Sequence, residues 1–162
     1  MEYNELMLKF GESFGLESFT PDDQGVYRLS VDDTIVSFYE IPQKGLVGTV
    51  ASICEVPCEG REQIYKILLS AMAPGGAAEE YDFFIGDEED GQCIYLRRTD
   101  VLAELDLESF RHALEEFANV MEDWRTSIQD YREALPAINA GLEERVDESR
   151  KLGMNLDGFM SV

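Results

Sequence analysis

A run of large apolar side chains between residues 107 and 135 is the feature that most constrains what this chain can fold into. These side chains follow one another at alternating steps of three and four, which is the spacing of one face of an α-helix. The run contains no glycine or proline, and Asp106 stands before it as an N-cap. The pattern predicts a single amphipathic helix whose apolar face consists of Leu107, Phe110, Leu114, Phe117, Met121, Trp124, Ile128, Tyr131 and Leu135.

This helix requires a packing partner. At about 1.5 Å per residue it would be roughly 43 Å long, and most of the stability of such a helix comes from burying its apolar face. The spacing also suits a coiled coil. However, Phe117, Trp124 and Tyr131 are bulky for a two-stranded seam, where leucine and β-branched residues are favoured. The pattern therefore favours packing against a sheet over a coiled coil.

The chain is strongly acidic along its whole length. Its 162 residues carry a formal net charge of −21, and basic and acidic residues number 5 and 14 up to Tyr81, and 8 and 20 after it. Such a surface repels nucleic acid and anionic membranes. The acidity serves solubility on the simplest interpretation, and a basic protein partner is the alternative.

The cysteines and the amino terminus indicate a reducing compartment. Cys54, Cys58 and Cys93 form no paired disulfide framework, and the residues that follow Met1 have neither the basic nor the apolar segment of a signal peptide. No apolar stretch is long enough to span a bilayer. We therefore expect a cytoplasmic protein that does not enter a membrane.

The first part of the chain changes from helical to strand periodicity. Apolar residues predict a helix over residues 3–14 that ends at Gly15. Strands are then predicted over residues 26–31, 34–41 and 46–56, with a tight turn at Asp32 and Asp33. Short connections between the three strands predict an antiparallel meander.

The second part adds a helix and a hairpin before the long helix. Helical spacing returns over residues 61–73, and strands over residues 81–85 and 93–97 flank an acidic loop at residues 86–91. The predicted order is α-β-β-β-α-β-β-α. The fold class is therefore α+β, an antiparallel β-sheet with helices packed on one face.

Pro136 marks a predicted boundary after the long helix. We expect residues 1–135 to form a single α+β domain and residues 136–162 a C-terminal helical or flexible extension, with a weaker, highly charged helix over residues 137–152.

The residues that an enzyme needs are missing from the sequence. The single histidine, His112, falls on the polar face of the long helix, and three residues separate Cys54 from Cys58, which is unlike a zinc or redox pair. We interpret the three cysteines as small apolar residues of the interior. The acidic loop at residues 86–91 lacks the ligand spacing of a calcium site, and no phosphate loop or nucleophile elbow is present. The sequence predicts no enzyme, no cofactor and no metal.

Two apolar features indicate a protein partner instead. The helix over residues 61–73 is apolar over more than half of its circumference and needs covering from outside its own domain. Phe10, Phe14 and Phe19 gather near the first loop, and the edge strands could accept an extended peptide. These aromatic residues either meet a partner or close the core, and the residues alone leave both interpretations open.

The ordered set of segments resembles the class I type III secretion chaperones, the Tir-chaperone or CesT-like family. The resemblance extends from residue 3 to residue 132. It is carried by residues 6–16 (LMLKFGESFGL), 27–40, 51–57 (ASICEVP), 64–71 (IYKILLSA) and 94–97 (IYLR), by Leu105 and Asp106 before the long helix, and by Leu114, Phe117, Trp124 and Arg125 within it.

The resemblance implies a homodimeric cytoplasmic chaperone. Members of this family bind the amino-terminal segment of a secreted effector in extended form, keep it competent for secretion, use no cofactor and hydrolyse nothing. By position, the implied dimer interface is Ile64, Ile67, Leu68, Ala71, Tyr81 and Phe83. The implied effector-binding residues are Phe10, Phe14, Leu16, Leu29, Val36 and Phe38.

Two features depart from the family pattern. Met72, Ala73 and Pro74 stand where an asparagine often follows the leucine-rich helix, and residues 136–162 extend beyond the usual end. A regulatory or adaptor protein on the same fold, which binds a folded partner, is the alternative to a chaperone.

Overall fold

The structure is a computed structural model that describes residues 2–16, 18–31, 34–88 and 91–151, with the side chains of residue 88 and residues 141–151 excepted. The chain divides into two compact units, residues 1–125 and residues 126–162, and each is described by itself. The predicted domain boundary after residue 135 stays a prediction.

Unit 1 contains a five-stranded antiparallel sheet. The strands are β1 (Tyr27–Val31), β2 (Thr34–Ile41), β3 (Leu46–Glu55), β4 (Tyr81–Glu88) and β5 (Gly91–Val101). They lie in the order β1-β2-β3-β5-β4, and every neighbouring pair is antiparallel. The meander of the first three strands and the hairpin of the last two are therefore confirmed.

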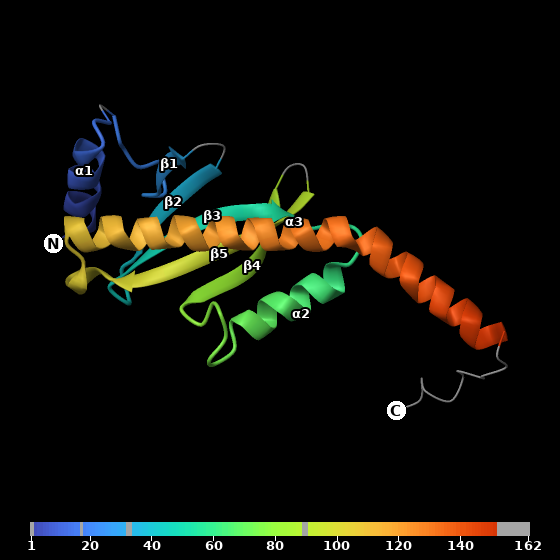
Figure 1. The fold of residues 1–162 in the computed structure, drawn as a ribbon. Coiled ribbons are helices and arrows are strands. Elements are labelled where there is room, and N and C mark those ends of the chain that lie inside the picture. Colours follow the sequence, from blue (N-terminus) through green and yellow to red (C-terminus); the bar gives the residue numbers. More distant parts are fainter. Residues whose placement is uncertain (1, 17, 32–33, 89–90, 152–162) are drawn as a thin grey trace. The chain divides into compact units, whose positions relative to one another are not determined.

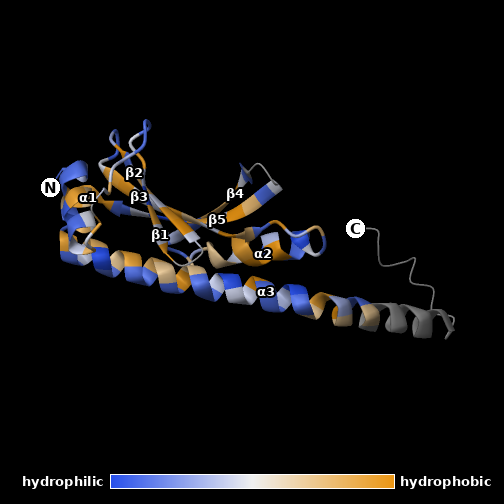
Figure 2. Ribbon diagram, turned by 90° about the horizontal axis from the view of Figure 1, so that it is seen from above, coloured by the Kyte–Doolittle hydropathy of each residue, from blue (hydrophilic) through white to orange (hydrophobic). Residues whose placement is uncertain are grey.

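Three α-helices accompany the sheet. They are α1 (Tyr3–Ser13), α2 (Arg61–Ala71) and α3 (Leu107–Lys151), and a short 3₁₀ turn, Leu102–Glu104, precedes α3. In unit 1, all three helices lie on the same side of the sheet (Figures 1 and 2). The α+β class and the order α-β-β-β-α-β-β-α are confirmed. Figure 2 also shows hydrophobic and hydrophilic bands alternating along α3, as an amphipathic helix requires.

The core of unit 1 lies between the sheet and the helices α1 and α3. Phe10 of α1, Phe38 of β2 and Phe110 of α3 meet with ring centroids 5.1–5.8 Å apart, and each of the three is 0–1% exposed. Further along α3, Phe117 packs on Tyr81 with ring centroids 6.4 Å apart. Within unit 1, α3 therefore packs on the sheet and does not form a coiled-coil seam.

The helix ends follow from local hydrogen bonds. The backbone N–H of Ser109 donates to Asp106 Oδ1 over 2.8 Å, and the N–H of Asp106 donates to Ser109 Oγ over 2.9 Å, which is a reciprocal cap at the start of α3. At the other end of the domain's first helix, Gly15 has a φ of 68°, and α1 ends as predicted. The predicted N-cap at Asp106 is confirmed.

The hairpin of β4 and β5 differs from its prediction. Gly86, Asp87 and Glu88 belong to β4 and Gly91 opens β5, so the two strands extend well into the segment predicted as an acidic loop. Gly86 is tolerated in the strand because the Tyr95 ring covers it. The turn predicted at Asp32 and Asp33 lies outside the described residues.

The second difference from the prediction lies in the part of α3 that belongs to unit 2. The predicted end of the long helix at residue 135 is wrong, because Pro136 lies inside α3 and the helix continues to Lys151 (Figure 1). An interior proline removes one helical hydrogen bond and its ring clashes with the preceding turn, which kinks a helix or breaks it. Here the helix continues, because the alanine, leucine, glutamate and arginine residues that follow Pro136 are good helix formers. Residue 152 of the predicted second helix lies outside the described residues.

Candidate functional site

The face of the sheet that points away from the helices carries exposed apolar side chains. We call it the outer face, and its residues alternate along each strand with those of the core. Ile35 of β2 is 59% exposed and Phe84 of β4 is 40% exposed. Tyr39, Val50 and Tyr95 lie half-buried between them. Exposed apolar surface of this kind is typical of a protein-binding face.

Two tyrosine rings make the outer face smooth. A Cβ atom at Gly48 would stand 2.4 Å from the Tyr39 ring, and one at Gly86 would stand 2.7 Å from the Tyr95 ring. The rings therefore lie close over the bare backbone of the two glycines. Tyr95 also stacks on Phe84, with centroids 5.2 Å apart and planes 11° apart. Together these rings form an apolar surface across strands β2 to β4.

Charged side chains on this face are paired. Arg97 of β5 donates from Nη2 to Asp82 Oδ2 over 2.7 Å, and its guanidinium lies 5.8 Å from the Phe84 ring centroid. The hydrogen bond to Asp82 raises the pKa of Arg97 above its usual range. At the far edge, the backbone N–H groups of Val26 and Gln24, together with Arg28, hold the pKa of Asp22 below its usual value.

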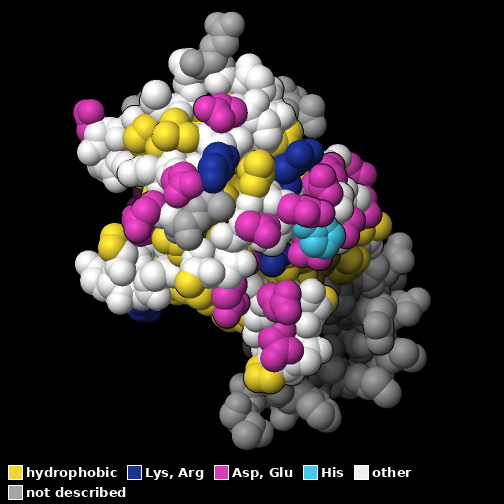
Figure 3. Space-filling view, turned by 90° about the vertical axis from the view of Figure 1, so that its left-hand side faces the viewer, with side chains coloured by type: hydrophobic (Ala, Val, Ile, Leu, Met, Phe, Trp, Pro, Cys, Tyr) yellow, Lys and Arg dark blue, Asp and Glu magenta, His cyan; other side chains and the backbone are white. Residues whose placement is uncertain are grey.

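An exposed aromatic side chain stands at the end of α1. Phe14, directly after the helix, is 50% exposed, and Leu8, in the middle of α1, is 53% exposed. The guanidinium of Arg111, from α3, lies 5.3 Å from the Phe14 ring centroid, within the range of a cation–π contact. Figure 3 shows this end of the molecule, where hydrophobic side chains stand among many carboxylates.

The predicted effector-binding residues divide into two groups. Phe10, Val36 and Phe38 are at most 1% exposed and lie in the core of unit 1. Phe10 and Phe38 pack on each other and on Phe110 of α3, and the assignment of these residues as effector contacts stays a prediction. Phe14 is exposed, and Leu16 and Leu29 are half-buried, so these three stay candidates.

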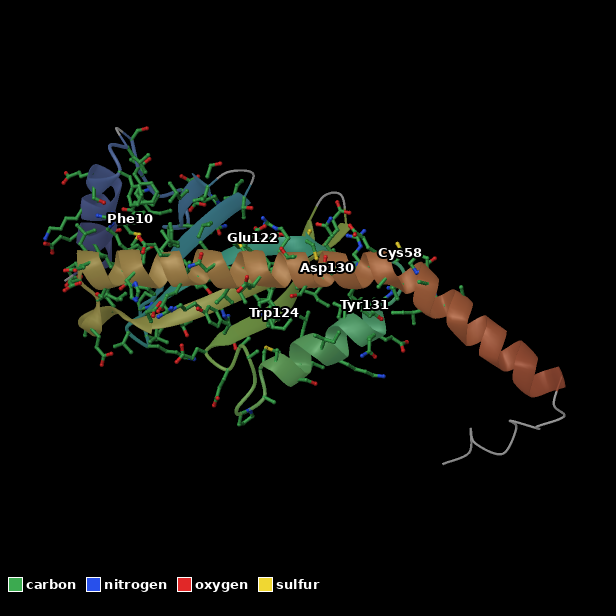
Figure 4. All side chains as sticks on the ribbon, in the orientation of Figure 1. Phe10, Cys58, Glu122, Trp124, Asp130 and Tyr131 are labelled. Carbon is green, nitrogen blue, oxygen red and sulfur yellow. The ribbon has the colours of Figure 1, made fainter. Side chains whose placement is uncertain are left out.

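The predicted dimer residues differ in how far they are exposed. Ile64, Leu68, Ala71 and Tyr81 are 1–9% exposed within this one chain, whereas Ile67 is 39% exposed. Phe83 is half-buried against Trp124 of α3, with ring centroids 5.0 Å apart, and its backbone N–H donates to Met72 Sδ over 3.1 Å. Trp124 is labelled in Figure 4. Of the predicted set, Ile67 and Phe83 are the side chains that a second copy could contact. Leu69 of α2, 65% exposed, was not predicted.

Chemical groups are sparse in the described part of the chain. No cluster of three or more histidine, cysteine, aspartate or glutamate residues there could hold a metal. His112 is exposed beside Glu116, with Nε2 and Oε1 3.3 Å apart, and Figure 3 shows it among carboxylates. Cys93 is buried and Cys58 is exposed, so the interpretation of the cysteines as interior residues is wrong for Cys58. Among the described residues, no helix is long and apolar enough to cross a membrane.

Sequence reasoning missed the outer face. Ile35, Tyr39, Tyr95 and Phe84 lie in segments that were correctly predicted as strands, but their direction depends on the register of the sheet. Ser30 pairs with Ile35, and Phe84 pairs with Tyr95, both on the outer side. Apolar residues alternate imperfectly within residues 34–41, so the pattern alone does not say which set faces the core.

Solved structures share this fold. A chain in the crystal structure of the ExsC–ExsE complex superimposes with a TM-score of 0.63 at 24% identity, over 76% of this chain and 90% of that one. A chain of the HopA1–SchA chaperone–effector complex gives 0.60 at 15% identity, over 76% and 93%. A chain in the crystal structure of the Yersinia pestis type III secretion chaperone SycH in complex with a stable fragment of YscM2 gives 0.54 at 16% identity, over 76% and 99%.

The sequence comparisons identify the family. No curated protein matches the chain significantly. The sequence model of the Tir chaperone protein (CesT) family matches residues 5–125, which is most of the chain and nearly the whole of unit 1. This chain therefore belongs to the Tir chaperone protein (CesT) family.

Proposed function

We propose that this protein is a type III secretion chaperone that binds the amino-terminal segment of a secreted effector in the bacterial cytoplasm. We call this partner the client. The family assignment over residues 5–125 carries the proposal. The HopA1–SchA structure is a chaperone–effector complex, and SycH is bound to a fragment of another protein, which supports a polypeptide as the ligand here.

The surface of the molecule fits an extended client. An unfolded segment exposes apolar side chains at intervals, and a smooth sheet face with separate apolar positions can bind several of them without a deep pocket. Ile35 and Phe84 on the outer face and Phe14 at the end of α1 are the exposed positions for such contacts. The client would remain competent for secretion because it gains no tertiary fold of its own.

The acidic surface would add selectivity for the client. With a net charge of −21, the chaperone attracts a client segment that is basic at the margins of its apolar contacts. The same charge keeps the chaperone soluble while apolar side chains remain exposed. No step of this function requires a nucleophile, a metal or a cofactor, and we propose that the protein is not an enzyme.

We further propose that the active form is a homodimer. Exposed Ile67 and Leu69 on α2 and half-buried Phe83 on β4 are the available contacts for a second copy. Strand β4 lies at the edge of the sheet, and α2 precedes it in the chain, so one surface could include both elements. Sedimentation or light scattering of wild type and Ile67→Glu would test this contact, with a shift from dimer to monomer expected.

Co-purification tests the chaperone function. The tagged protein would be isolated from its native host, and bound material would undergo limited proteolysis and mass spectrometry. The proposal predicts a protected amino-terminal fragment of one secreted protein. Phe14→Asp should release this fragment, whereas Ser13→Asp, an adjacent exposed position at the end of α1, should retain it. A folded, uncleaved regulator as the partner would contradict the proposal and favour an adaptor.

A further inference from the structure

Strands β2 and β3 separate at one end of the sheet. Their pairing runs from Ile41 and Leu46 to Val36 and Ala51, and stops there. β2 nevertheless begins at Thr34, and β3 continues to Glu55. On its other side, β3 has a register shift between Ser52 and Cys54, where it pairs with β5. A bulge of this kind bends the strand and increases its twist. We call this opening between β2 and β3 the fork.

Arg125 of α3 enters the fork from the helix side. Its Nε donates to the Ile53 carbonyl over 3.1 Å, and its Nη2 donates to Thr34 Oγ1 over 2.8 Å and to the Ser52 carbonyl over 3.4 Å. The guanidinium thus bonds β3 and β2 at the point where they no longer bond to each other. Its side chain is about one-third exposed, although α3 lies on the core side of the sheet.

A cavity at the fork opens toward the outer face. It has a volume of about 530 Å³. Arg125 and Thr34 line its inner part, and Val50 and Ser52 come from β3. On the outer side it is lined by Arg28 and Ser37, which are paired across β1 and β2, and by Ile35 and Tyr95. Small side chains at positions 37 and 52 leave the space between these larger neighbours open.

The cavity concentrates positive charge on an acidic protein. Two guanidinium groups, those of Arg28 and Arg125, line it, and no described lining residue is acidic. Each arginine has an acidic partner beside the cavity. Asp22 pairs with Arg28, and Glu122, labelled in Figure 4, pairs with Arg125 over 3.2 Å. The Glu122 side chain is 63% exposed, so this pair is screened by water and weak.

We infer that the fork cavity binds the carboxylate of an aspartate or glutamate side chain from a bound extended peptide. This inference rests on the proposed function, because the peptide is a segment of the client. Arg28, which uses Nη1 to bond Asp22, supplies the N–H donors, and Arg125, most of whose donors bond the fork and Glu122, adds the positive charge that a carboxylate prefers. Ile35, Val50 and the Tyr95 ring supply apolar contacts for the aliphatic part of the same side chain. The client then needs an acidic residue at one position, in spite of the acidity of the chaperone.

A peptide library tests the inference without knowledge of the client. The full-length protein would be immobilised and panned against displayed random 12-residue peptides. We expect selected sequences to share an acidic residue beside apolar ones. Replacing that residue by its amide should weaken binding at least tenfold, as measured by fluorescence anisotropy with a synthetic labelled peptide.

Variants of the chaperone locate the site. Ser37→Phe fills the cavity from the outer face, and Arg28→Gln removes a guanidinium. Each substitution should weaken binding of the same peptide at least tenfold. Both positions lie on the outer face and outside the core, so circular dichroism should remain unchanged. Lys44→Gln is the control, because Lys44 carries the same charge at the opposite end of β2 and β3 and should bind normally. Selected peptides without an acidic residue, no selected peptides at all, or equal binding by Ser37→Phe would overturn the inference.

Failure of this inference can be distinguished from failure of the proposed function. If a protected client fragment binds Arg28→Gln and Ser37→Phe as tightly as wild type, the chaperone function is supported. The same result contradicts the carboxylate site at the fork. If peptides bind at the fork through an acidic residue but the native partner is a folded protein, the carboxylate site is supported and the chaperone function is contradicted.

Discussion

The two faces of β2 contrast within a single strand. Val36 and Phe38 are at most 1% exposed, whereas Ile35, which lies between Val36 and Thr34 in the chain, is 59% exposed. Apolar side chains thus occur on both sides, but only one side has helices to cover it. The difference teaches that apolar residues of this sheet serve two purposes. The inner set holds the domain together, and the outer set remains available for a polypeptide partner.

Close packing accounts for the stability of the inner face. Phe38 contacts Phe10, Phe19 and Phe110, with ring centroids 5.5–6.5 Å apart. In the described part of unit 1, the outer face has no helices packed over it, so its side chains are less closely packed. Its rings lie flat over Gly48 and Gly86, and its arginines bond carboxylates near the surface. Substitutions on the two faces should therefore differ in what they damage.

The largest effect should come from the inner face. Phe38→Ala removes a ring that is 0% exposed and leaves a cavity between β2, α1 and α3. We expect it to lower the free energy of unfolding by about 3–5 kcal/mol, as measured by urea denaturation. A loss below about 1 kcal/mol would show that this region repacks easily and would remove the contrast between the faces.

Arg125 joins the two faces, and its removal should have an intermediate effect. Arg125→Met keeps much of the side-chain volume but removes the donors to the Ile53 carbonyl and Thr34 Oγ1. We expect a loss of about 1–3 kcal/mol in urea denaturation. Arg111→Met is the matched control on the same helix and should cost less than about 1 kcal/mol, since its guanidinium lies over the half-exposed ring of Phe14. Equal effects of the two substitutions would contradict the role of Arg125 at the fork.

Tyr3 offers a smaller test of the inner face. Its hydroxyl oxygen is buried with no hydrogen-bond partner among the described residues, and burial raises its pKa above the usual range. Tyr3→Phe should therefore be neutral or should stabilise the protein by about 1 kcal/mol in thermal denaturation. Tyr27→Phe is the control, because Tyr27 Oη donates to Asn4 Oδ1 over 3.3 Å, and it should lose up to about 1 kcal/mol. Destabilisation by Tyr3→Phe larger than that of the control would show that Tyr3 has a partner.

The smallest effect on stability should come from the outer face. Ile35→Ser changes a side chain that is 59% exposed and should alter the free energy of unfolding by no more than about 0.5 kcal/mol. The same change should weaken client binding, because it removes an apolar contact from the outer face. Isothermal titration with the co-purified fragment would measure this. Strong destabilisation with normal binding would mean that Ile35 belongs to the core.

Local patterns were sufficient to predict the elements of unit 1. The three–four spacing after Asp106 predicted the part of α3 that packs on the sheet, and glycine and proline positions predicted most strand ends. The end of α3 was not predicted, because Pro136 was assigned as a helix end although the residues after it favour a helix.

The candidate site was harder to predict because it depends on contacts between distant segments. Phe10 and Phe14 lie four residues apart and look equivalent in sequence, but they differ in burial. Phe10 is 0% exposed between Phe38 and Phe110, whereas Phe14 packs on Phe10 from outside and is 50% exposed. The direction of Ile35 requires the register of β1 and β2. The contact of Arg125 with Ile53 joins residues 72 positions apart, which no helical pattern contains.

Hydrogen–deuterium exchange of the chaperone, alone and with its co-purified client fragment, tests the central claim most directly. If the outer face and the end of α1 bind the client, peptides that cover Phe14, β1 and β2 should exchange more slowly in the complex, while the slow exchange of the core part of α3 should stay unchanged. Protection confined to α2 and β4, or no gain in protection at β1 and β2, would contradict the account.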